Sequence, residues 1–220
     1  MPKIIVFDVN ETLLDLKVLD EPFRKIFGDV RIKSEWFSQL LHASTVVTLT
    51  GAYTDFGSVG GHALEIVAKR NGVSLREEDK LLISGTMKNL PPHPEVPESL
   101  RRLKDAGLRI AALTNSSQEM VTAQLTNTGI YNLFDIVMSV DGCQKFKPAP
   151  EVYQMAAQEL KEEPGNLCLV AAHEWDISGA MRCGWSGAFI ARPGKVLGPL
   201  SVVPEIVGPD LQAVAEQLLK

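Results

Sequence analysis

Residues 4–15 read IIVFDVNETLLD, an apolar run that ends in the carboxylate of Asp8. A short and nearly continuous apolar run is typical of a strand that is buried on both faces of a parallel sheet. In open α/β sheets, ligands bind outside the carboxyl ends of such strands. The stretch therefore predicts a parallel α/β sheet and makes Asp8 a candidate nucleophile, metal ligand or cap of the following segment. Asn10 stands two residues later, where a second acidic residue would be expected.

The later part of the chain repeats this pattern. Apolar, β-branched runs predict further buried strands, and helical patterns with Pro, Ser or Gly at their ends fill the gaps. Alternation of strand and helix is the signature of a doubly wound, Rossmann-like α/β domain. The expected strands are 3–8, 109–115, 134–140, 167–172 and 187–192, and the expected helices are 97–107, 117–129, 149–163 and 174–185.

Residues 14–92 interrupt this alternation. Helical patterns follow one another directly after the first strand, and the Pro-rich run PPHPEVP (91–97) leads back to the alternating part. We therefore predict a catalytic core formed by residues 1–13 and 93–220, with an inserted helical cap formed by residues 14–92.

The composition excludes several classes of protein. The net charge of −5 and the pI near 5.4 argue against binding to nucleic acid or to an anionic membrane. No stretch approaches the roughly 20 apolar residues of a membrane span, and the first residues lack the pattern of a signal peptide. The three cysteines have no CxxC spacing and are expected to be reduced, apolar fillers. We expect a cytoplasmic enzyme that acts on a small molecule.

Polar side chains stand at the ends of several predicted strands. Taken singly, each is most simply explained as a turn former, a helix cap or a basic loop residue. Parallel strands, however, bring their carboxyl ends to one edge of the sheet, so that carboxylates, an amide, hydroxyls and a lysine would meet there. These residues are Asp8, Thr114–Ser116, Lys147 and His173–Asp176.

Four segments carry a specific resemblance: FDVNETLLD (7–15), LTNSS (113–117), KFKPAPEVY (145–153) and VAAHEWDISGA (170–180). In this order they resemble the four motifs of the haloacid dehalogenase superfamily. The chain is most similar to type II L-2-haloacid dehalogenases, and GAYTDFGSVGGHAL (51–64) resembles a segment of their cap. The resemblance implies a Rossmann-like core, a four-helix cap and a homodimer.

The resemblance also implies a mechanism. Asp8 would attack the α-carbon of a short (S)-2-haloacid, expel halide and leave an ester, which water hydrolyses to a 2-hydroxy acid. Thr12 and Asn115 would position the carboxylate or the substrate, and Lys147 would stabilise the charge. Lys145 is a second candidate for that role, but the Lys-Pro pair at 147–148 matches the motif. The other residues predicted to bind substrate are Asn10, Ser116, Phe56 and Trp175, of which Phe56 and Trp175 match an apolar pocket.

Asn10 favours dehalogenation over phosphate transfer. Phosphatases of the superfamily usually carry Asp at this position as a general acid, and an amide does not donate and recover a proton near neutral pH. Halide leaves without a proton, so a dehalogenase tolerates the amide. We expect a reaction without metal ion or cofactor. A Mg²⁺-dependent phosphatase, with Asp8 and Asp176 offering two oxygen ligands, is one alternative, and a catalytically silent homologue that binds an organic acid is another.

One departure from the family pattern concerns the halide. Many members carry an Arg in the cap that binds the departing halide, whereas residues 43–51 contain no basic residue. Asn115, or polar groups of the cap such as His42, are the remaining candidates for this contact.

A second departure concerns the water that cleaves the ester. Ala171 and His173 stand where family members often have Ser and Asn. We expect His173 to activate this water, because imidazole is a better base than an amide. A base of this kind needs an orienting carboxylate, for which Glu21 is the expected partner. Asp176 is the alternative base.

Overall fold

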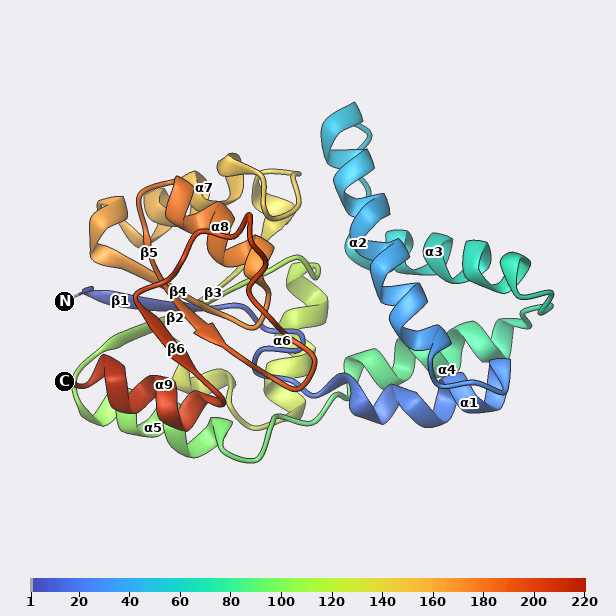
Figure 1. Cartoon of the computed structure of the whole chain (residues 1–220), viewed down its shortest axis with the longest axis horizontal. Helices are drawn as coiled ribbons and strands as arrows, with labels where there is room; N and C mark the ends of the chain where they lie inside the picture. Colours follow the sequence, from blue (N-terminus) through green and yellow to red (C-terminus); the bar gives the residue numbers. More distant parts are fainter. Residues whose placement is uncertain (1) are drawn as a thin grey trace.

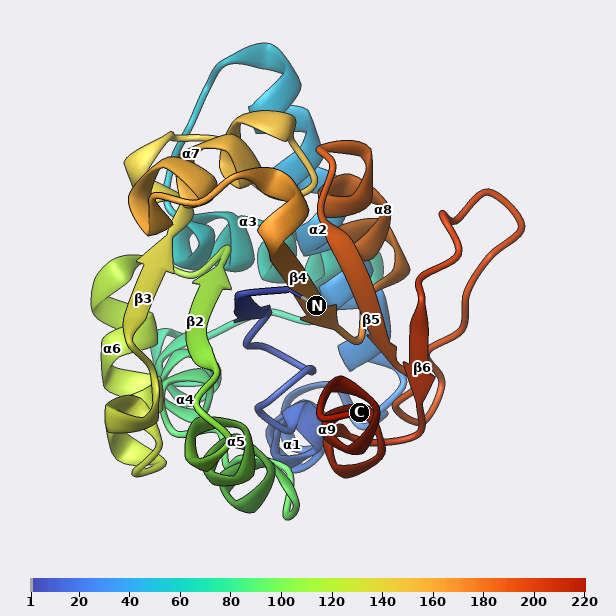
Figure 2. The ribbon, with the colours of Figure 1, turned by 90° about the vertical axis from the view of Figure 1, so that its left-hand side faces the viewer.

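The predicted strands lie side by side in one sheet (Figure 2). In the computed structural model, which describes residues 2–220, the sheet has six strands in the order β3-β2-β1-β4-β5-β6, and every neighbouring pair is parallel. The strands are β1 (Ile4–Phe7), β2 (Arg109–Thr114), β3 (Ile136–Ser139), β4 (Leu167–Ala171), β5 (Ser186–Ile190) and β6 (Ile206–Gly208). The predicted α/β class with a parallel sheet is confirmed. β6 was not predicted, because three residues are too few to form a recognisable apolar run.

Helices cover both faces of this sheet. α7 and α8 lie on one face, and α5 and α9 pack against each other on the other face (Figure 1). The helices of this part are α5 (Val96–Asp105), α6 (Gln118–Asn127), α7 (Pro150–Leu160), α8 (Glu174–Arg182) and α9 (Leu211–Leu218). Short 3-10 turns are η1 (Leu16–Leu19), η2 (Tyr131–Leu133), η3 (Val140–Gly142) and η4 (Pro164–Asn166).

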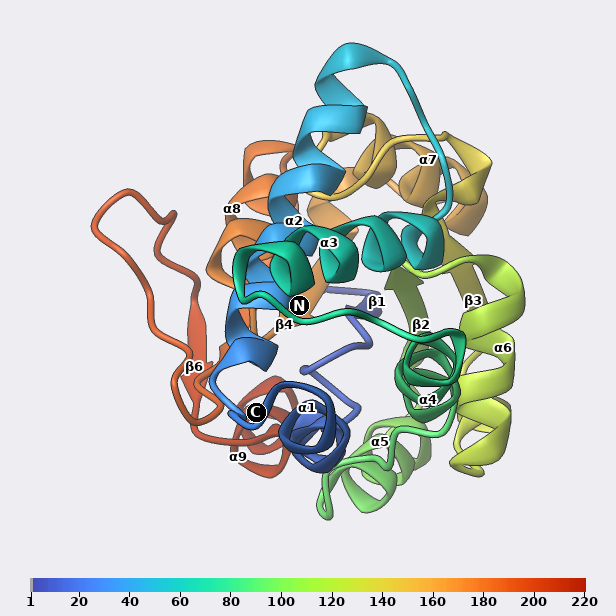
Figure 3. The same ribbon diagram turned by 90° about the vertical axis from the view of Figure 1, so that its right-hand side faces the viewer.

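Four further helices form a group of their own beyond the carboxyl end of β1 (Figures 1 and 3). They are α1 (Asp20–Phe27), α2 (Ile32–Thr50), α3 (Phe56–Arg70) and α4 (Glu77–Lys88). The chain leaves and re-enters the sheet through two neighbouring segments, since Leu14 forms an antiparallel bridge with Pro92. All four helices fall within residues 14–92, and the division of the chain into core and cap at these positions stays a prediction.

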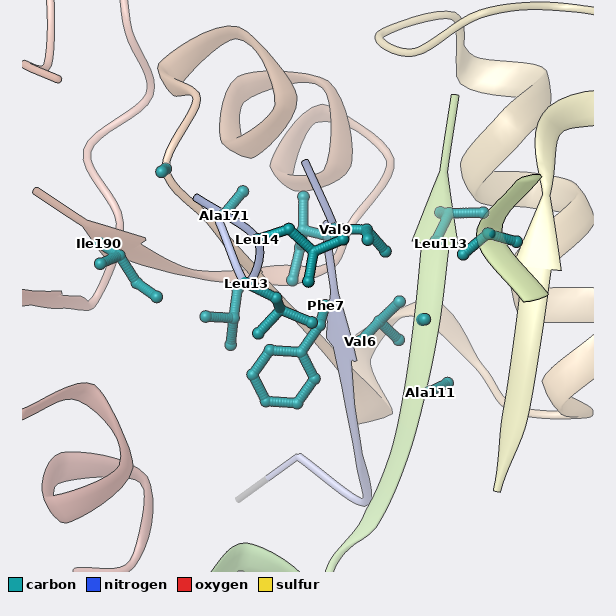
Figure 4. Close-up of a cluster of buried hydrophobic side chains, with 14 of the residues drawn as sticks. Val6, Phe7, Val9, Leu13, Leu14, Ala111, Leu113, Ala171 and Ile190 are labelled. Atoms are coloured by element: carbon teal, nitrogen blue, oxygen red, sulfur yellow. The ribbon is translucent and has the colours of Figure 1, made fainter. Parts of the chain in front are cut away.

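Apolar packing holds the segment around Asp8 in place. Val6, Phe7 and Val9 are fully buried, and so are Leu13 and Leu14 in the turn that follows (Figure 4). Leu13 N and Leu14 N both donate to the backbone oxygen of Val9. Because apolar side chains anchor the backbone on both sides of Asp8, the carboxylate is held at the strand end within the core rather than in solvent.

Candidate active site

Asp8 follows β1 and is only 5% exposed. Its Oδ2 accepts a hydrogen bond of 2.6 Å from Thr12 Oγ1, and its Oδ1 accepts one of 2.8 Å from Lys147 Nζ. Thr12 Oγ1 itself accepts a hydrogen bond from Ala172 N at 2.9 Å. Since a hydroxyl has one proton to donate, the Thr12 proton points to Asp8. The carboxylate is therefore held by a fixed donor at each oxygen.

Lys147 joins Asp8 to a second buried carboxylate. Its Nζ donates to Asp176 Oδ2 at 2.6 Å, and Tyr153 Oη donates to Asp176 Oδ1 at 2.7 Å. Burial alone would lower the pKa of Lys147, but the charges of Asp176 and Asp8 raise it overall. Burial raises the pKa of Asp8, yet Lys147 and His173 outweigh this effect and hold it well below its usual range. Asp8 is thus ionised and Lys147 protonated at neutral pH.

This packing leaves no space at Gly179 of α8. A Cβ atom there would lie 2.6 Å from Tyr153 Oη and 2.7 Å from Pro148 Cβ. Tyr153 is fully buried and cannot move aside. Glycine at this position allows the Tyr153 hydroxyl to reach Asp176.

Lys145 serves a different purpose from Lys147. Its Nζ donates to the backbone oxygen of Thr48 at 3.1 Å, and Phe146 N donates to Thr48 Oγ1 at 3.0 Å. These bonds attach the end of α2 to the loop that carries Lys147. Of the two lysines, the structure brings Lys147 to Asp8. This is the lysine that the Lys-Pro pair at 147–148 favoured.

His173 lies on the other side of Asp8 and is 6% exposed. Its Nδ1 is 3.1 Å from Asp8 Oδ2, and its Nε2 is 2.8 Å from Glu11 Oε2. Its ring stacks between Trp175 and Phe37, with ring centroids 5.0 and 6.1 Å away. Burial lowers the pKa of His173, but the hydrogen bonds and charges of Asp8 and Glu11 outweigh it and raise the pKa to about 9. At neutral pH the imidazole therefore carries a proton on each nitrogen.

The expected pairing of His173 with Glu21 is wrong. Glu21 lies in the first turn of α1, its side chain is 76% exposed, and it forms an ion pair with Arg24 three residues later. Because α1 belongs to the separate group of helices, its first turn presents Glu21 to solvent. The carboxylate that meets His173 is Glu11, which the sequence analysis missed.

Glu11 belongs to the turn directly after Asp8. Its backbone has φ +63°, a left-handed conformation that is uncommon for residues other than glycine and often marks a functional site. This conformation places Asp8 and Glu11 on either side of the His173 ring. The sequence did contain a signal for Glu11, since an acidic residue three positions after Asp8 shares its turn.

The amides of the site are held by neighbouring side chains. Asn10 Nδ2 donates to Ser116 Oγ at 3.1 Å, and Gln124 Nε2 donates to Asn10 Oδ1 at 3.3 Å. Asn115 Oδ1 accepts from Lys147 N at 2.9 Å. Asn10 is therefore an acceptor and donor within a buried network, and fully buried Gln124 is a further member that was not predicted.

A cavity of about 240 Å³ lies between α2, α3, α4 and the start of α6. Its lining is mainly apolar, and Ser116 brings it next to the Asn10 amide. Phe56 lines this cavity as expected for a pocket residue, whereas Trp175 stacks on His173 instead. The buried or half-buried apolar side chains in its wall are Trp36, Leu40, Phe56, Leu64, Ile83, Met87 and Met120.

Comparison with known proteins identifies the family. The sequence profile described as haloacid dehalogenase-like hydrolase matches residues 2–184. The chain belongs to the haloacid dehalogenase-like hydrolases. The (S)-2-haloacid dehalogenase of Pseudomonas sp. strain YL is 31% identical over 219 residues, which are 97% of this chain and 93% of the relative. The haloacetate dehalogenase H-2 of Moraxella sp. strain B is 27% identical over 212 residues, 96% of this chain and 95% of the relative.

Solved structures of the family agree with this assignment. The L-2-haloacid dehalogenase of Xanthobacter autotrophicus, with chloropropionic acid covalently bound, superimposes with a TM-score of 0.92 at 26% identity. The match covers 99% of this chain and 98% of that protein. The resemblance to the haloacid dehalogenase superfamily, which was inferred from the four motifs, is confirmed.

Mg²⁺ is the metal ion that the alternative function, a phosphatase, would need. Mg²⁺ requires several oxygen ligands in near-octahedral geometry. Here the ammonium of Lys147 lies within 2.8 Å of Asp8 and 2.6 Å of Asp176. Across residues 2–220, no group of three His, Cys, Asp or Glu side chains is arranged to hold a metal ion. The residues do not fit a metal of this kind.

His42, the residue of the predicted cap that was named for halide binding, lies away from the site. His42 is exposed on α2 and lines a separate hollow between α2 and α3 together with His62. None of the residues that contact Asp8 line this hollow. Of the two candidates, only Asn115 contacts the loop of Lys147.

Within residues 2–220, none of the helices is long and apolar enough to span a bilayer.

Proposed function

We propose that this protein hydrolyses short-chain (S)-2-haloacids to 2-hydroxy acids through a covalent ester on Asp8. The observation that carries the proposal is the neighbourhood of the Asp8 carboxylate. It is ionised, held at both oxygens, and accompanied at position 10 by an amide that Ser116 and Gln124 keep in place. A carboxylate without a neighbouring acid suits displacement of halide, a leaving group that needs no proton.

In the first half-reaction, an oxygen of Asp8 attacks the α-carbon as the carbon–halogen bond breaks. The electron pair of that bond leaves with the halide, and Asp8 loses its charge in the new ester. Lys147 keeps a partner throughout, because Asp176 Oδ2 also accepts from its ammonium group. The relative with covalently bound chloropropionic acid supports an intermediate of this kind.

In the second half-reaction, His173 acts as the base. The ester removes one of the two carboxylate charges that hold a proton on the ring, so the pKa of His173 falls and Nδ1 releases its proton to solvent. Nδ1 then takes a proton from the water that attacks the ester carbonyl carbon. The bond from that carbon to the substrate oxygen breaks, and His173 returns the proton to the 2-hydroxy acid. The acidic proton left on Asp8 moves to His173, which restores the resting state.

Asp176 is the less suitable base of the two. Both of its oxygens accept strong hydrogen bonds, from Lys147 and from Tyr153. His173 has one nitrogen on Asp8 and the other on Glu11, which orients the ring and stabilises its charge.

The variant His173→Asn tests this assignment. We expect a burst of halide from 2-chloropropionate, followed by loss of at least about 100-fold in turnover, with the ester accumulating on Asp8 in mass spectra. Asp8→Asn is the control and should release no halide. A steady-state rate in His173→Asn equal to that of the unmodified enzyme would rule out the base role.

The same assay separates the alternatives. Halide release from chloroacetate, bromoacetate and 2-chloropropionate that survives EDTA supports the proposed reaction. EDTA-sensitive phosphate release from small phosphate esters would favour a phosphatase. Release of neither product would identify a silent homologue that binds an organic acid.

We further propose that the enzyme works in the cytoplasm as a homodimer. Sedimentation equilibrium of the purified chain tests the dimer, and cell fractionation tests the location. A sedimenting mass of 24.1 kDa would mean a monomer.

A further inference from the structure

Lys195 approaches the site from a segment far along the chain. It lies in the long connection between β5 and β6, which projects beside α8 and α2 (Figure 3). Lys195 Nζ donates to Glu11 Oε2 at 2.6 Å, and this is the same oxygen that His173 Nε2 meets at 2.8 Å. The ammonium also lies 5.7 Å from the ring centroid of Phe37 in α2.

The base of this segment is fixed to the turn of the nucleophile. Arg192 is 7% exposed, and its Nη2 donates to the backbone oxygen of Thr12 at 2.8 Å. Its Nη1 forms an ion pair of 2.6 Å with Glu95. Lys195 N in turn donates to Arg192 O at 2.8 Å. Lys195 is thus placed by a buried arginine that contacts the same turn as Asp8 and Glu11.

We propose that Lys195 is a positioning residue for ester hydrolysis: it holds Glu11 against the His173 ring and offsets part of the Glu11 charge, so that His173 releases its proton once Asp8 is esterified. This inference rests on the proposed function. Lys195 touches neither the substrate carbon nor the water in this scheme and acts only through Glu11.

The charges around His173 show why this lysine matters. Asp8 and Glu11 face the ring nitrogens, and Lys195 faces Glu11. Lys147 lies beyond Asp8 and is shared with Asp176, while the rings of Phe37 and Trp175 are uncharged. The other nearby titratable groups are turned to different partners: Glu174 accepts from Ser201, Arg192 pairs with Glu95, and His93 Nε2 lies 3.2 Å from the backbone oxygen of Glu11.

Formation of the ester on Asp8 removes one negative charge from the surroundings of His173. Once Asp8 is neutral, Glu11 is the carboxylate left on the imidazole, and Lys195 compensates it. A protonated ring would then sit beside a compensated ion pair, which gives it little stabilisation against burial. Without Lys195, the uncompensated Glu11 would keep the proton on His173 and leave no free base.

The variants Lys195→Met, Lys195→Arg and Glu11→Gln test this charge balance. The breakdown of the Asp8 ester is followed by rapid quench and mass spectrometry between pH 5 and 10. In Lys195→Met, the midpoint of the pH profile of ester breakdown should rise by about one pH unit. The halide burst should be unchanged. Lys195→Arg keeps the charge and should keep the midpoint. Glu11→Gln should lower it. Lys88→Met is the matched control, because Lys88 is exposed and forms no ion pair within residues 2–220.

A titration of the resting enzyme provides a second readout that needs no turnover. The chain has four histidines, so His173→Asn assigns the His173 imidazole signal in NMR spectra. We expect Lys195→Met to raise its titration midpoint and Glu11→Gln to lower it. A merely structural role would slow ester breakdown in both variants with both midpoints unmoved, and that result would overturn the proposal. If the unmodified enzyme forms no ester and releases no halide, the proposed function itself fails.

Discussion

The two oxygens of Asp8 face two clusters of charged side chains that differ in their access to solvent. On the Oδ1 side, Lys147 and Asp176 have side chains that are 1% and 0% exposed. On the Oδ2 side, His173 is 6% exposed, but its partners Glu11 and Lys195 are 21% and 24% exposed. One cluster is sealed in the core, and the other reaches the surface through two side chains.

This difference matches the needs of two reaction steps. Charges in a sealed cluster stay fixed, because transfer of a proton to water and rearrangement of the side chains both cost much free energy there. Such a cluster suits a step in which a nucleophile must stay ionised. A cluster that includes imidazole and reaches solvent can exchange protons between steps. In the proposed reaction, displacement of halide belongs to the lysine side and hydrolysis of the ester to the histidine side.

The largest effect is expected from removing the centre of the sealed cluster. Lys147→Met leaves Asp8 and Asp176 buried without their shared cation, which should cost about 3–5 kcal/mol of unfolding free energy and abolish measurable halide release. Urea denaturation and a halide assay measure both quantities. Lys145→Met is the control and should retain most of the activity, because the Lys145 ammonium group bonds to the end of α2 and not to Asp8. Equal losses in both variants would mean that the lysines share one role.

An intermediate effect is expected from the histidine side as the pH changes. The pKa of His173 is about 9 in the folded protein against an ordinary value of 6.5. A raised pKa stabilises the fold below the ordinary value, and this stabilisation is lost as the pH rises through the folded value. The unfolding free energy should therefore decrease between pH 6.5 and 9, by roughly 3 kcal/mol if the full difference applies.

The control for this pH effect is His173→Asn. Urea denaturation at pH 6, 7.5 and 9 should show the decrease in the unmodified protein and a much flatter profile in the variant. The same slope in both proteins would show that His173 is not protonated in the folded state.

The smallest effect is expected from the carboxylate first assigned to His173. Glu21→Gln removes an exposed ion pair with Arg24, and such pairs contribute little. Turnover and its pH profile should stay within about twofold of the unmodified enzyme, whereas Glu11→Gln should alter the profile. Steady-state halide release across the pH range compares the two variants directly. A changed profile in Glu21→Gln would place that residue back in the site.

Much of the fold was predictable because local patterns decide it. Continuous apolar runs and the helices between them predict a parallel sheet, and β1 to β5 follow these runs. The same logic brought Asp8, Asn115, Lys147 and Asp176 to one edge, because parallel strands end on the same side. β6 was missed because its three residues carry too little pattern.

The amino-acid sequence by itself determined the family, the sheet, and the identity of the chemical groups at the strand ends, including the amide at position 10. The sheet follows from residue periodicity, which acts locally, and the family follows from the resemblance of four motifs in their order. Only the tertiary structure decided which carboxylate meets His173 and which lysine supports it. Glu11 turns back through a left-handed backbone, and Lys195 arrives from 184 positions further along the chain. Hydrogen bonds depend on where atoms meet in space: the spacing places Glu11 in the turn of Asp8, but nothing in the sequence records that His173 and Lys195 meet it there.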